Sequence, residues 1–182
     1  MRIITGTLKG RKIPVPDTGL LRPTSDRTKE GIFSALASRI FFENRTVLDL
    51  FAGSGNLGFE AISRGASSVI FVDSETDHLK HIEKLALSFG VEKQIQPVIS
   101  TVEDYLDKTG KSFDIIFADP PYDYYAIKDL PDIILKNGWL QNDGLLVLEH
   151  DKRVQFSEHK KCIYSKAYGR TIVSIFQADT VD

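Results

Sequence analysis

The stretch VLDLFAGSGNLG, residues 47–58, constrains the fold more than any other part of the chain. An apolar run ends in a loop that carries Gly53, Gly55 and Gly58, and a helix-forming sequence follows it. Gly53 and Gly55 let a ligand approach the backbone at the point where a buried strand gives way to a helix, and we expect Gly58 to serve helix packing. The stretch therefore predicts a strand–loop–helix unit of an open α/β sheet, with a ligand at the carboxyl end of the strand.

The rest of the chain alternates between strand-like and helix-like segments. Apolar runs predict strands at 68–73, 95–100, 113–118 and 144–150, and helical periodicity predicts helices at 75–89, 102–108 and 130–138. The tail, 161–177, has two β-like runs joined at Tyr168 and Gly169, which indicates a terminal hairpin. We expect a single doubly wound, Rossmann-like α/β domain with a mostly parallel seven-stranded sheet that ends in this antiparallel hairpin.

The N-terminal part reads as a basic extension, residues 1–25, that precedes the main domain, 26–182. A β-ribbon or extended arm is expected first, and a helix follows it, with Thr24, Ser25 or Asp26 as the cap. Apolar residues at helical spacing predict the buried face of that helix: Ile32, Phe33, Leu36, Ala37, Ile40 and Phe41. Residues 1–30 carry seven Lys or Arg and three acids, whereas the whole chain has a net charge of −2. Such an arm is either a footprint for a phosphate backbone or a solvated edge.

Composition excludes several classes of protein. The chain of 182 residues has a single cysteine, Cys162, which excludes an intramolecular disulfide and a cysteine-rich zinc site. No apolar run is long enough for a signal peptide or a membrane span. We expect a cytoplasmic protein that does not contact membranes and is a monomer.

Asp49 favours one kind of ligand for the glycine loop over another. A dinucleotide site places a pyrophosphate on the helix amides, and a carboxylate four residues before Gly53 would repel that anion. The same carboxylate attracts an ammonium or sulfonium group, and S-adenosylmethionine carries both and no phosphate. Asp73, at the end of the second strand, is placed to accept hydrogen bonds from ribose hydroxyls, which fits either ligand.

The sequence Asp119-Pro120-Pro121-Tyr122 follows the fourth predicted strand and supplies the reaction. A carboxylate and the carbonyl before a proline can accept the two N–H hydrogens of a planar amine, while the tyrosine stacks on its ring. These contacts aim the amine lone pair at a methyl donor. Such a transfer depends mainly on positioning and requires neither a covalent nucleophile nor a metal.

These motifs resemble those of class I methyltransferases that modify exocyclic amines of nucleic acid bases. The segments 10–36, 49–66 and 168–176 extend the resemblance over nearly the whole chain, to the bacterial 16S rRNA (guanine-N2) methyltransferase D family. The resemblance implies methyl transfer from S-adenosylmethionine, which becomes S-adenosylhomocysteine, to N2 of guanine 966 in the usual rRNA numbering. It also implies that the partner is 16S rRNA within a small ribosomal subunit or an assembly intermediate.

The resemblance assigns site residues to three groups. The catalytic and base-binding group is Asp119, Pro120, Pro121 and Tyr122. The cofactor-binding group is Asp49, Phe51, Ala52, Gly53, Ser54, Gly55, Asp73, Thr101, Val102 and Thr24. The substrate-binding group is Arg22, Arg27, Arg11 and Lys12. Thr101 stands at the turn where the wider class often has an aspartate, so its contact with adenine is open, and Thr24 could equally be a helix cap.

Alternative functions follow from the same residues. A DNA or RNA adenine-N6 methyltransferase would use the same motif, although the chain has no room for a separate target-recognition domain. An NAD-dependent oxidoreductase and a non-catalytic RNA-binding module are the other two. His78 and His81 could suggest a metal pair, but no carboxylate or cysteine completes it, and we expect both on the surface.

Overall fold

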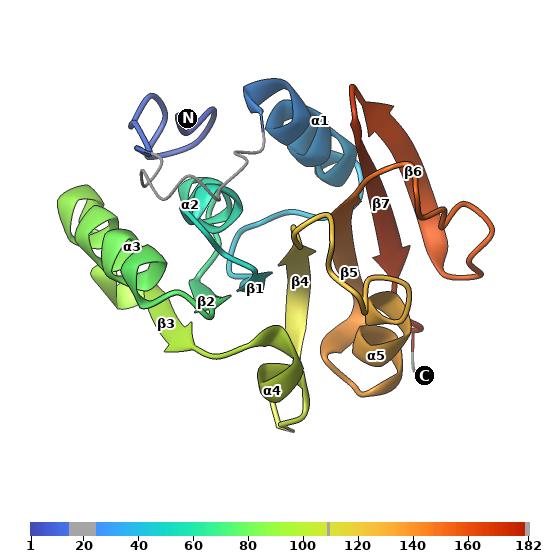
Figure 1. The fold of residues 1–182 in the computed structure, drawn as a ribbon. Coiled ribbons are helices and arrows are strands. Elements are labelled where there is room, and N and C mark those ends of the chain that lie inside the picture. The colour runs from blue at the N-terminus through green and yellow to red at the C-terminus, as the bar shows by residue number, and fades with distance from the viewer. Residues whose placement is uncertain (15–24, 109, 181–182) are drawn as a thin grey trace.

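A seven-stranded sheet organises the computed structural model, which describes residues 1–14, 25–108 and 110–180 (Figure 1). The strand order is β3-β2-β1-β4-β5-β7-β6. Strands β1 to β5 pair in parallel, and β7 pairs antiparallel with both β5 and β6. The predicted doubly wound sheet with an antiparallel terminal hairpin is therefore confirmed.

The elements follow the predicted alternation. The strands are β1 Thr46–Leu50, β2 Ser68–Asp73, β3 Ile95–Ile99, β4 Phe113–Ala118, β5 Leu140–His150, β6 Cys162–Tyr168 and β7 Thr171–Gln177. The helices are α1 Asp26–Ala37, α2 Asn56–Ser63, α3 Thr76–Phe89, α4 Val102–Leu106 and α5 Leu130–Lys136, and a 3-10 turn, η1, spans Glu92–Gln94. Chain order reverses between β1 and β4, and such a reversal creates a crevice at the carboxyl ends of those strands.

Two apolar clusters cover the two faces of the sheet. Helices α1, α2 and α3 pack on one face, where the cluster includes Phe33, Phe71 and Phe117. Helices α4 and α5 pack on the other face, where the cluster includes Leu48 and Trp139. Because the central strands are buried on both sides, their sequences are almost continuously apolar, which is why the chain could be divided correctly into elements.

Helix α1 begins after a predicted cap but ends sooner than its apolar pattern suggests. Ser25 is the N-cap, and its hydroxyl accepts a hydrogen bond from the Thr28 amide at 3.1 Å. The helix ends at Ala37, so Ile40 and Phe41 lie beyond it, and the Phe41 side chain is exposed. The prediction that both belong to the buried helical face is wrong, because the chain leaves the helix and buries Phe42 instead.

The first residues of the chain pack on α2. Arg2 and Lys12 form an antiparallel bridge, and Ile3, Leu8 and Ile13 are buried in the same cluster as α1 and α2. These residues therefore share the core of the main domain. The domain boundary at residue 25 stays a prediction. Among the described residues, no helix combines the length and apolar character needed to cross a bilayer.

A buried ion pair fixes that N-terminal segment. Glu60 of α2 lies 3.3 Å from the Lys29 ammonium and 3.0 Å from the Arg64 guanidinium, and both Lys29 and Glu60 are fully buried. The Glu60 carboxylate also accepts hydrogen bonds from the amides of Ile4 and Thr5. Lys29 donates to the Arg2 carbonyl at 2.5 Å and to Asn56 Oδ1 at 2.8 Å. Burial lowers the pKa of Lys29, and Glu60 opposes that shift.

Candidate functional site

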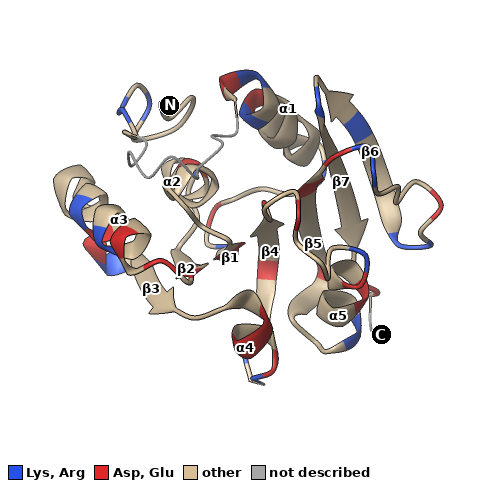
Figure 2. Cartoon of the chain, in the orientation of Figure 1, with Lys and Arg blue, Asp and Glu red and all other residues tan. Residues whose placement is uncertain are grey.

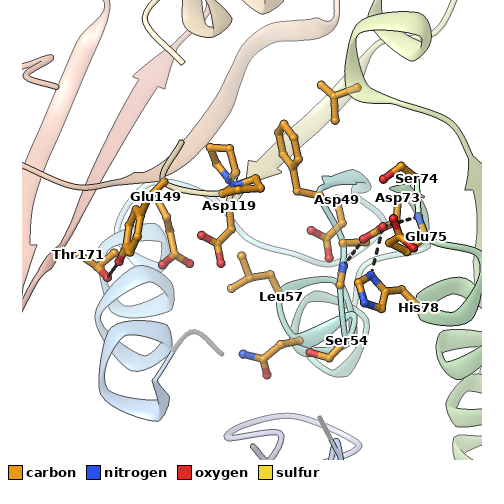
Figure 3. Close-up of a pocket in the computed structure, with 18 of the residues that line it drawn as sticks. Asp49, Ser54, Leu57, Asp73, Ser74, Glu75, His78, Asp119, Glu149 and Thr171 are labelled. Atoms are coloured by element: carbon orange, nitrogen blue, oxygen red, sulfur yellow. Dashed lines mark hydrogen bonds and ion pairs between the residues drawn. The ribbon is translucent and has the colours of Figure 1, made fainter. Parts of the chain in front are cut away.

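A pocket of about 850 Å³ opens at the carboxyl ends of β1 to β5 (Figure 3). Its lining includes most of the residues predicted for the cofactor and the reaction: Asp49, Phe51, Ala52, Gly53, Ser54, Asp73, Thr101, Val102, Asp119, Pro120, Pro121 and Tyr122. These residues come from four strands and their loops. The fold thus brings together side chains that are up to 73 positions apart, from Asp49 to Tyr122.

Four carboxylates enter the pocket from one face of the sheet. Asp73, Asp49, Asp119 and Glu149 each come two residues after a side chain of the cluster that α1, α2 and α3 cover: Phe71, Val47, Phe117 and Val147. Because side chains in a strand alternate between faces, Asp49, Asp73 and Glu149 point to that same side, and Asp119 directly follows β4. Figure 3 shows Asp49, Asp119 and Glu149 directed into the same space. The floor of the pocket is therefore acidic.

The loop after β1 has an unusual backbone. Phe51 has a φ of +59°, which is uncommon for a residue with a side chain, and Gly53 and Gly55 also have positive φ. The Phe51 ring packs edge-on against Tyr124, with centroids 5.0 Å apart. This packing holds the strained residue in place and forms one wall of the pocket.

Gly58 of α2 serves packing rather than close approach to a ligand. A Cβ atom at this position would lie 2.2 Å from the Phe71 ring. Its amide donates a hydrogen bond to Asp49 Oδ2 at 2.9 Å. The third glycine of the motif therefore allows α2 to approach the sheet closely enough to orient Asp49.

Asp49 is a buried carboxyl group whose ionisation is disfavoured. It is 3% exposed, and burial raises the pKa of its carboxyl well above the usual range, with Asp119 and Asp73 adding to the shift. The Gly58 hydrogen bond opposes this shift but does not outweigh it. A cation in the pocket would stabilise the ionised form.

Asp73 is held rigidly at the end of β2. Its carboxylate accepts hydrogen bonds from the amides of Gly53 at 2.7 Å and Glu75 at 2.9 Å. His78 Nδ1 lies 3.2 Å from Asp73 Oδ1, and the His78 side chain is buried. The expectation that His78 lies on the surface is wrong, because the first turn of α3 folds this ring against Asp73. His81, by contrast, lies beside the Pro14 carbonyl at 2.9 Å.

The turn after β3 is occupied by a helix cap. Thr101 is the N-cap of α4, and its hydroxyl accepts a hydrogen bond from the Asp104 amide at 3.1 Å. Ser100, Thr101, Val102 and Glu103 all line the pocket. A contact of Thr101 with adenine stays a prediction. The backbone of this turn and the side chains beside Thr101 are further candidates for contacting adenine.

The loop after β4 presents Tyr122 at the rim of the pocket. Its hydroxyl lies 3.3 Å from Thr171 Oγ1 of β7, and its carbonyl accepts a hydrogen bond from Arg153 Nη2 at 2.6 Å. The Tyr122 side chain is 37% exposed. The ring is therefore oriented by two distant segments and remains accessible to a ligand.

Several pocket residues were not predicted from the sequence. The main ones are Glu149 at the end of β5, Asn56 at the start of α2, and Tyr168, Gly169, Arg170 and Thr171 around the β6–β7 turn. Glu149 had a usable signal, because it ends an apolar strand in the same way as Asp73. Asn56 had none, since its Nδ2 becomes a buried donor without a hydrogen-bond partner only after folding.

The predicted substrate-binding residues lie apart from the pocket lining where they are described. The Arg11 guanidinium lies over the Phe89 ring of α3 at 5.8 Å, and Lys12 belongs to the N-terminal bridge. Arg27 is the second residue of α1. Figure 2 shows Lys and Arg on the N-terminal segment, α1 and β6. Arg22 and Thr24 lie outside the described residues.

Comparison with known proteins identifies the family. A family model described as conserved hypothetical protein 95 matches residues 1–177. Ribosomal RNA small subunit methyltransferase D of Escherichia coli (strain K12) is 35% identical over 153 residues, which cover 83% of this chain and 75% of that protein. The chain belongs to the ribosomal RNA small subunit methyltransferase D family.

Other members of the methyltransferase D family and more distant structures agree in length and fold. The Bacillus subtilis (strain 168) protein YlbH is 35% identical over 97% of this chain and 98% of its own length. A solved Escherichia coli structure is 29% identical, with a TM-score of 0.86 over 100% of this chain and 99% of that one. A Salinibacter ruber RNA methyltransferase, solved with S-adenosyl-L-homocysteine, is 13% identical with a TM-score of 0.67 over 87% and 94%, which shows a shared fold.

The chemistry available to this methyltransferase D family member is that of positioned hydrogen bonds and charge. Within the described ranges, no group of three or more His, Cys, Asp or Glu side chains is arranged to hold a metal ion. Carboxylates, Pro120 and aromatic rings line the part of the pocket next to β4 and β5. Such groups can orient a cation and a planar amine toward one another.

Proposed function

We propose that this protein transfers a methyl group from S-adenosylmethionine to the exocyclic N2 of a guanine in small-subunit rRNA, in the cytoplasm. The observation that carries the proposal is the convergence of Asp49 and Asp73 with Asp119 and Pro120 in one pocket. The first two suit a cationic adenosine-containing cofactor, and the last two suit an exocyclic amine. The name of the Escherichia coli relative supports rRNA as the substrate.

The pocket fits S-adenosylmethionine by the charge of its lining. Buried Asp49 would balance the ammonium or sulfonium group, and Asp73 would accept hydrogen bonds from the ribose hydroxyls. The unpartnered Asn56 Nδ2, together with the Ser54 hydroxyl, offers donors for the carboxylate of the cofactor. The bound cofactor supplies an electrophilic methyl group. A pyrophosphate would face the carboxylates on the floor, so the oxidoreductase alternative fits poorly.

The loop after β4 would hold the target amine. The Asp119 carboxylate and the Pro120 carbonyl accept its two N–H hydrogens, while Tyr122 stacks on the base. Pro121 has no amide hydrogen, so it cannot compete for these acceptors. Thr171 and Arg153 keep Tyr122 in position through the two contacts described above. Positioning of this kind can supply a large part of a rate acceleration.

A base in an RNA loop suits the pocket better than a base in a duplex. An exocyclic amine in a helix is engaged in pairing, whereas a loop base can be turned out and stacked on an aromatic ring. The family resemblance gives guanine 966 of 16S rRNA, within a small subunit or an assembly intermediate, as the target. Arg170 at the pocket edge, together with Arg27, Arg11 and Lys12, would contact RNA phosphates around an otherwise acidic site.

The test is methyl transfer to small subunits that lack the modification, using labelled cofactor and mass-spectrometric mapping of the rRNA. Asp119→Ala should abolish transfer to guanine N2 while S-adenosylhomocysteine still raises the melting temperature, because Asp119 contacts the target base. Asp107→Ala, at an exposed position outside the pocket, is the matched control. Transfer to adenine N6, or to duplex DNA alone, would refute the guanine assignment. Full activity of Asp119→Ala would refute the catalytic one.

A further inference from the structure

We propose that Glu149 reads the N1–H group of the target base and thereby makes the site selective for guanine over adenine. The inference rests on the proposed function, because it assigns a second base-contacting carboxylate to the same pocket. Glu149 was not among the residues that the sequence predicted. Its assignment comes from the strand register and from the pocket lining.

The register of β4 and β5 places Glu149 beside Asp119. Ala118 of β4 is paired with Leu148 of β5. Asp119 directly follows Ala118, and Glu149 directly follows Leu148. Neighbouring parallel strands lie about 4.8 Å apart, so the two carboxylates are adjacent at the strand ends. Figure 3 shows both side chains directed into the pocket, with Glu149 on the side nearer Thr171.

The surroundings of Glu149 make its acceptors effective. The residue is 3% exposed, and it lies in the β5 strand between Leu148 and His150, which are both buried. On the other side, β5 pairs with β7, and Glu149 is opposite Val173. A carboxylate in such a dry environment discriminates strongly between a donor and an acceptor placed before it.

The hydrogen-bonding edge of guanine complements two adjacent carboxylates. Guanine presents the N2 amino group and the N1–H group side by side, and both are donors. With N2 held by Asp119 and the Pro120 carbonyl, N1–H faces the neighbouring acceptor, Glu149. Adenine presents an amino group beside an N1 acceptor, so its N1 lone pair would meet the carboxylate. A site built to hydrogen-bond a donor can reject an analogue without it by a factor of about 10⁴.

The same contact favours the chemical step. When N2 attacks the methyl group, the new N–C bond forms, and the electron pair of the broken C–S bond stays on sulfur. The N2 nitrogen, next to N1, then carries a positive charge until one of its protons leaves to the Asp119 carboxylate. A carboxylate at N1–H stabilises this charge as it develops. Glu149 therefore contributes to the rate as well as to base selection.

The inference can be tested with 2-aminopurine, which keeps the exocyclic N2 amine of guanine but has an acceptor at N1. Small subunits are reconstituted from rRNA with guanine or 2-aminopurine at nucleotide 966, and methyl transfer to each is measured as kcat/KM. The wild-type protein should prefer guanine by about 100-fold or more, as expected for loss of a charged hydrogen bond. Glu149→Gln should lower this preference at least about tenfold, because a glutamine amide can donate to the N1 acceptor.

The change of the ratio on mutation separates Glu149 from the intrinsic reactivities of the two bases. Glu158→Gln, an exposed glutamate outside the pocket, is the matched control and should keep the wild-type ratio. Binding of S-adenosylhomocysteine by Glu149→Gln should stay within about twofold of wild type, which also reports that the variant is folded.

Two results would overturn the inference. The first is an unchanged guanine preference in folded Glu149→Gln. The second needs no variant, and is equal use of guanine and 2-aminopurine by the wild-type protein. Failure of the proposed function looks different, since the wild-type protein would then transfer no methyl group to guanine at all.

Discussion

Removal of the Lys29 ammonium should destabilise the protein strongly, and Lys29→Met is the variant that isolates this effect. Lys29 is fully buried and contacts Glu60, the Arg2 carbonyl and Asn56 Oδ1. Breaking a buried ion pair by removal of one partner costs about 3–5 kcal/mol. Because Arg64 and two backbone amides still bind Glu60 in the variant, the loss of this ion pair should cost about 3 kcal/mol, at the lower end of that range. The Arg2 carbonyl and Asn56 Oδ1 each lose a donor, which adds about 1 kcal/mol for each acceptor. Burial of the apolar methionine side chain offsets part of this cost. We expect a loss of about 3–4 kcal/mol in the free energy of unfolding.

The assay is urea denaturation at pH 7, with unfolding monitored by circular dichroism. Lys136→Met is the matched control, because Lys136 Nζ lies 2.9 Å from Asp132 Oδ2, closer than Lys29 to Glu60, but both partners are largely exposed. Water screens that surface pair, so its loss should leave the urea midpoint almost unchanged. The comparison of the two variants tests the effect of burial, because the exposed Lys136–Asp132 pair has the shorter distance but is expected to be the weaker interaction.

The N-terminal segment gives an independent readout. Because Lys29 and Glu60 together bind the backbone at Arg2, Ile4 and Thr5, the variant should expose this segment to trypsin at Arg2, Lys9, Arg11 and Lys12. The reasoning would be refuted if Lys29→Met were destabilised no more than Lys136→Met, or if its N-terminal segment were cleaved no faster than that of the wild type.

Two further predictions concern ionisation. Asp49→Asn keeps an acceptor for the Gly58 amide but removes a buried carboxylate whose raised pKa makes its ionisation costly as pH rises. At pH 8 the ligand-free variant should therefore melt at least as high as the wild type. S-adenosylhomocysteine or S-adenosylmethionine, at concentrations that saturate the wild type, should no longer raise its melting temperature, and a shift as large as that of the wild type would contradict the role of Asp49. His150 is buried against Ser174, and burial lowers its pKa from 6.5, so it folds as the neutral form and its contribution to stability is lost as pH falls below about 6.5. Urea titrations should show the wild type losing up to about 1.4 kcal/mol more per pH unit than His150→Gln between pH 6.5 and 5, and parallel curves for the two proteins would count against this assignment.

The strand ends could be predicted because their signals are local. A strand buried on both faces is a short apolar run, and a polar residue that ends it stands at the sheet edge where ligands bind. This was enough to place Asp49, Asp73 and Asp119 in one pocket. Gly58 was also assigned correctly to helix packing, since a glycine inside a helix usually marks a close approach.

What could not be predicted depends on contacts and helix ends that are defined only in the folded chain. Glu149 becomes a site residue only through the pairing of Ala118 with Leu148. The burial of Lys29 depends on Glu60, a carboxylate 31 positions away. Periodicity also carried the first helix too far, because Ile40 and Phe41 keep its spacing after the helix has ended at Ala37. His78 was misjudged because its partner, Asp73, belongs to the preceding strand.

The attachment of the first residues to α2 has a consequence for the order of folding. Ile4 and its acceptor, Glu60, are 56 positions apart, so closing this loop costs roughly 3–4 kcal/mol of chain entropy. During synthesis this segment leaves the ribosome before α2 does, so its partners on α2 do not yet exist. Its apolar side chains, Ile3, Leu8 and Ile13, stay unburied until the first strand–helix unit has formed. This segment is thus made before the helix that fixes it and reaches its final place only after α2 has formed, and a chaperone that acts on the nascent protein could meet these apolar residues before they are buried.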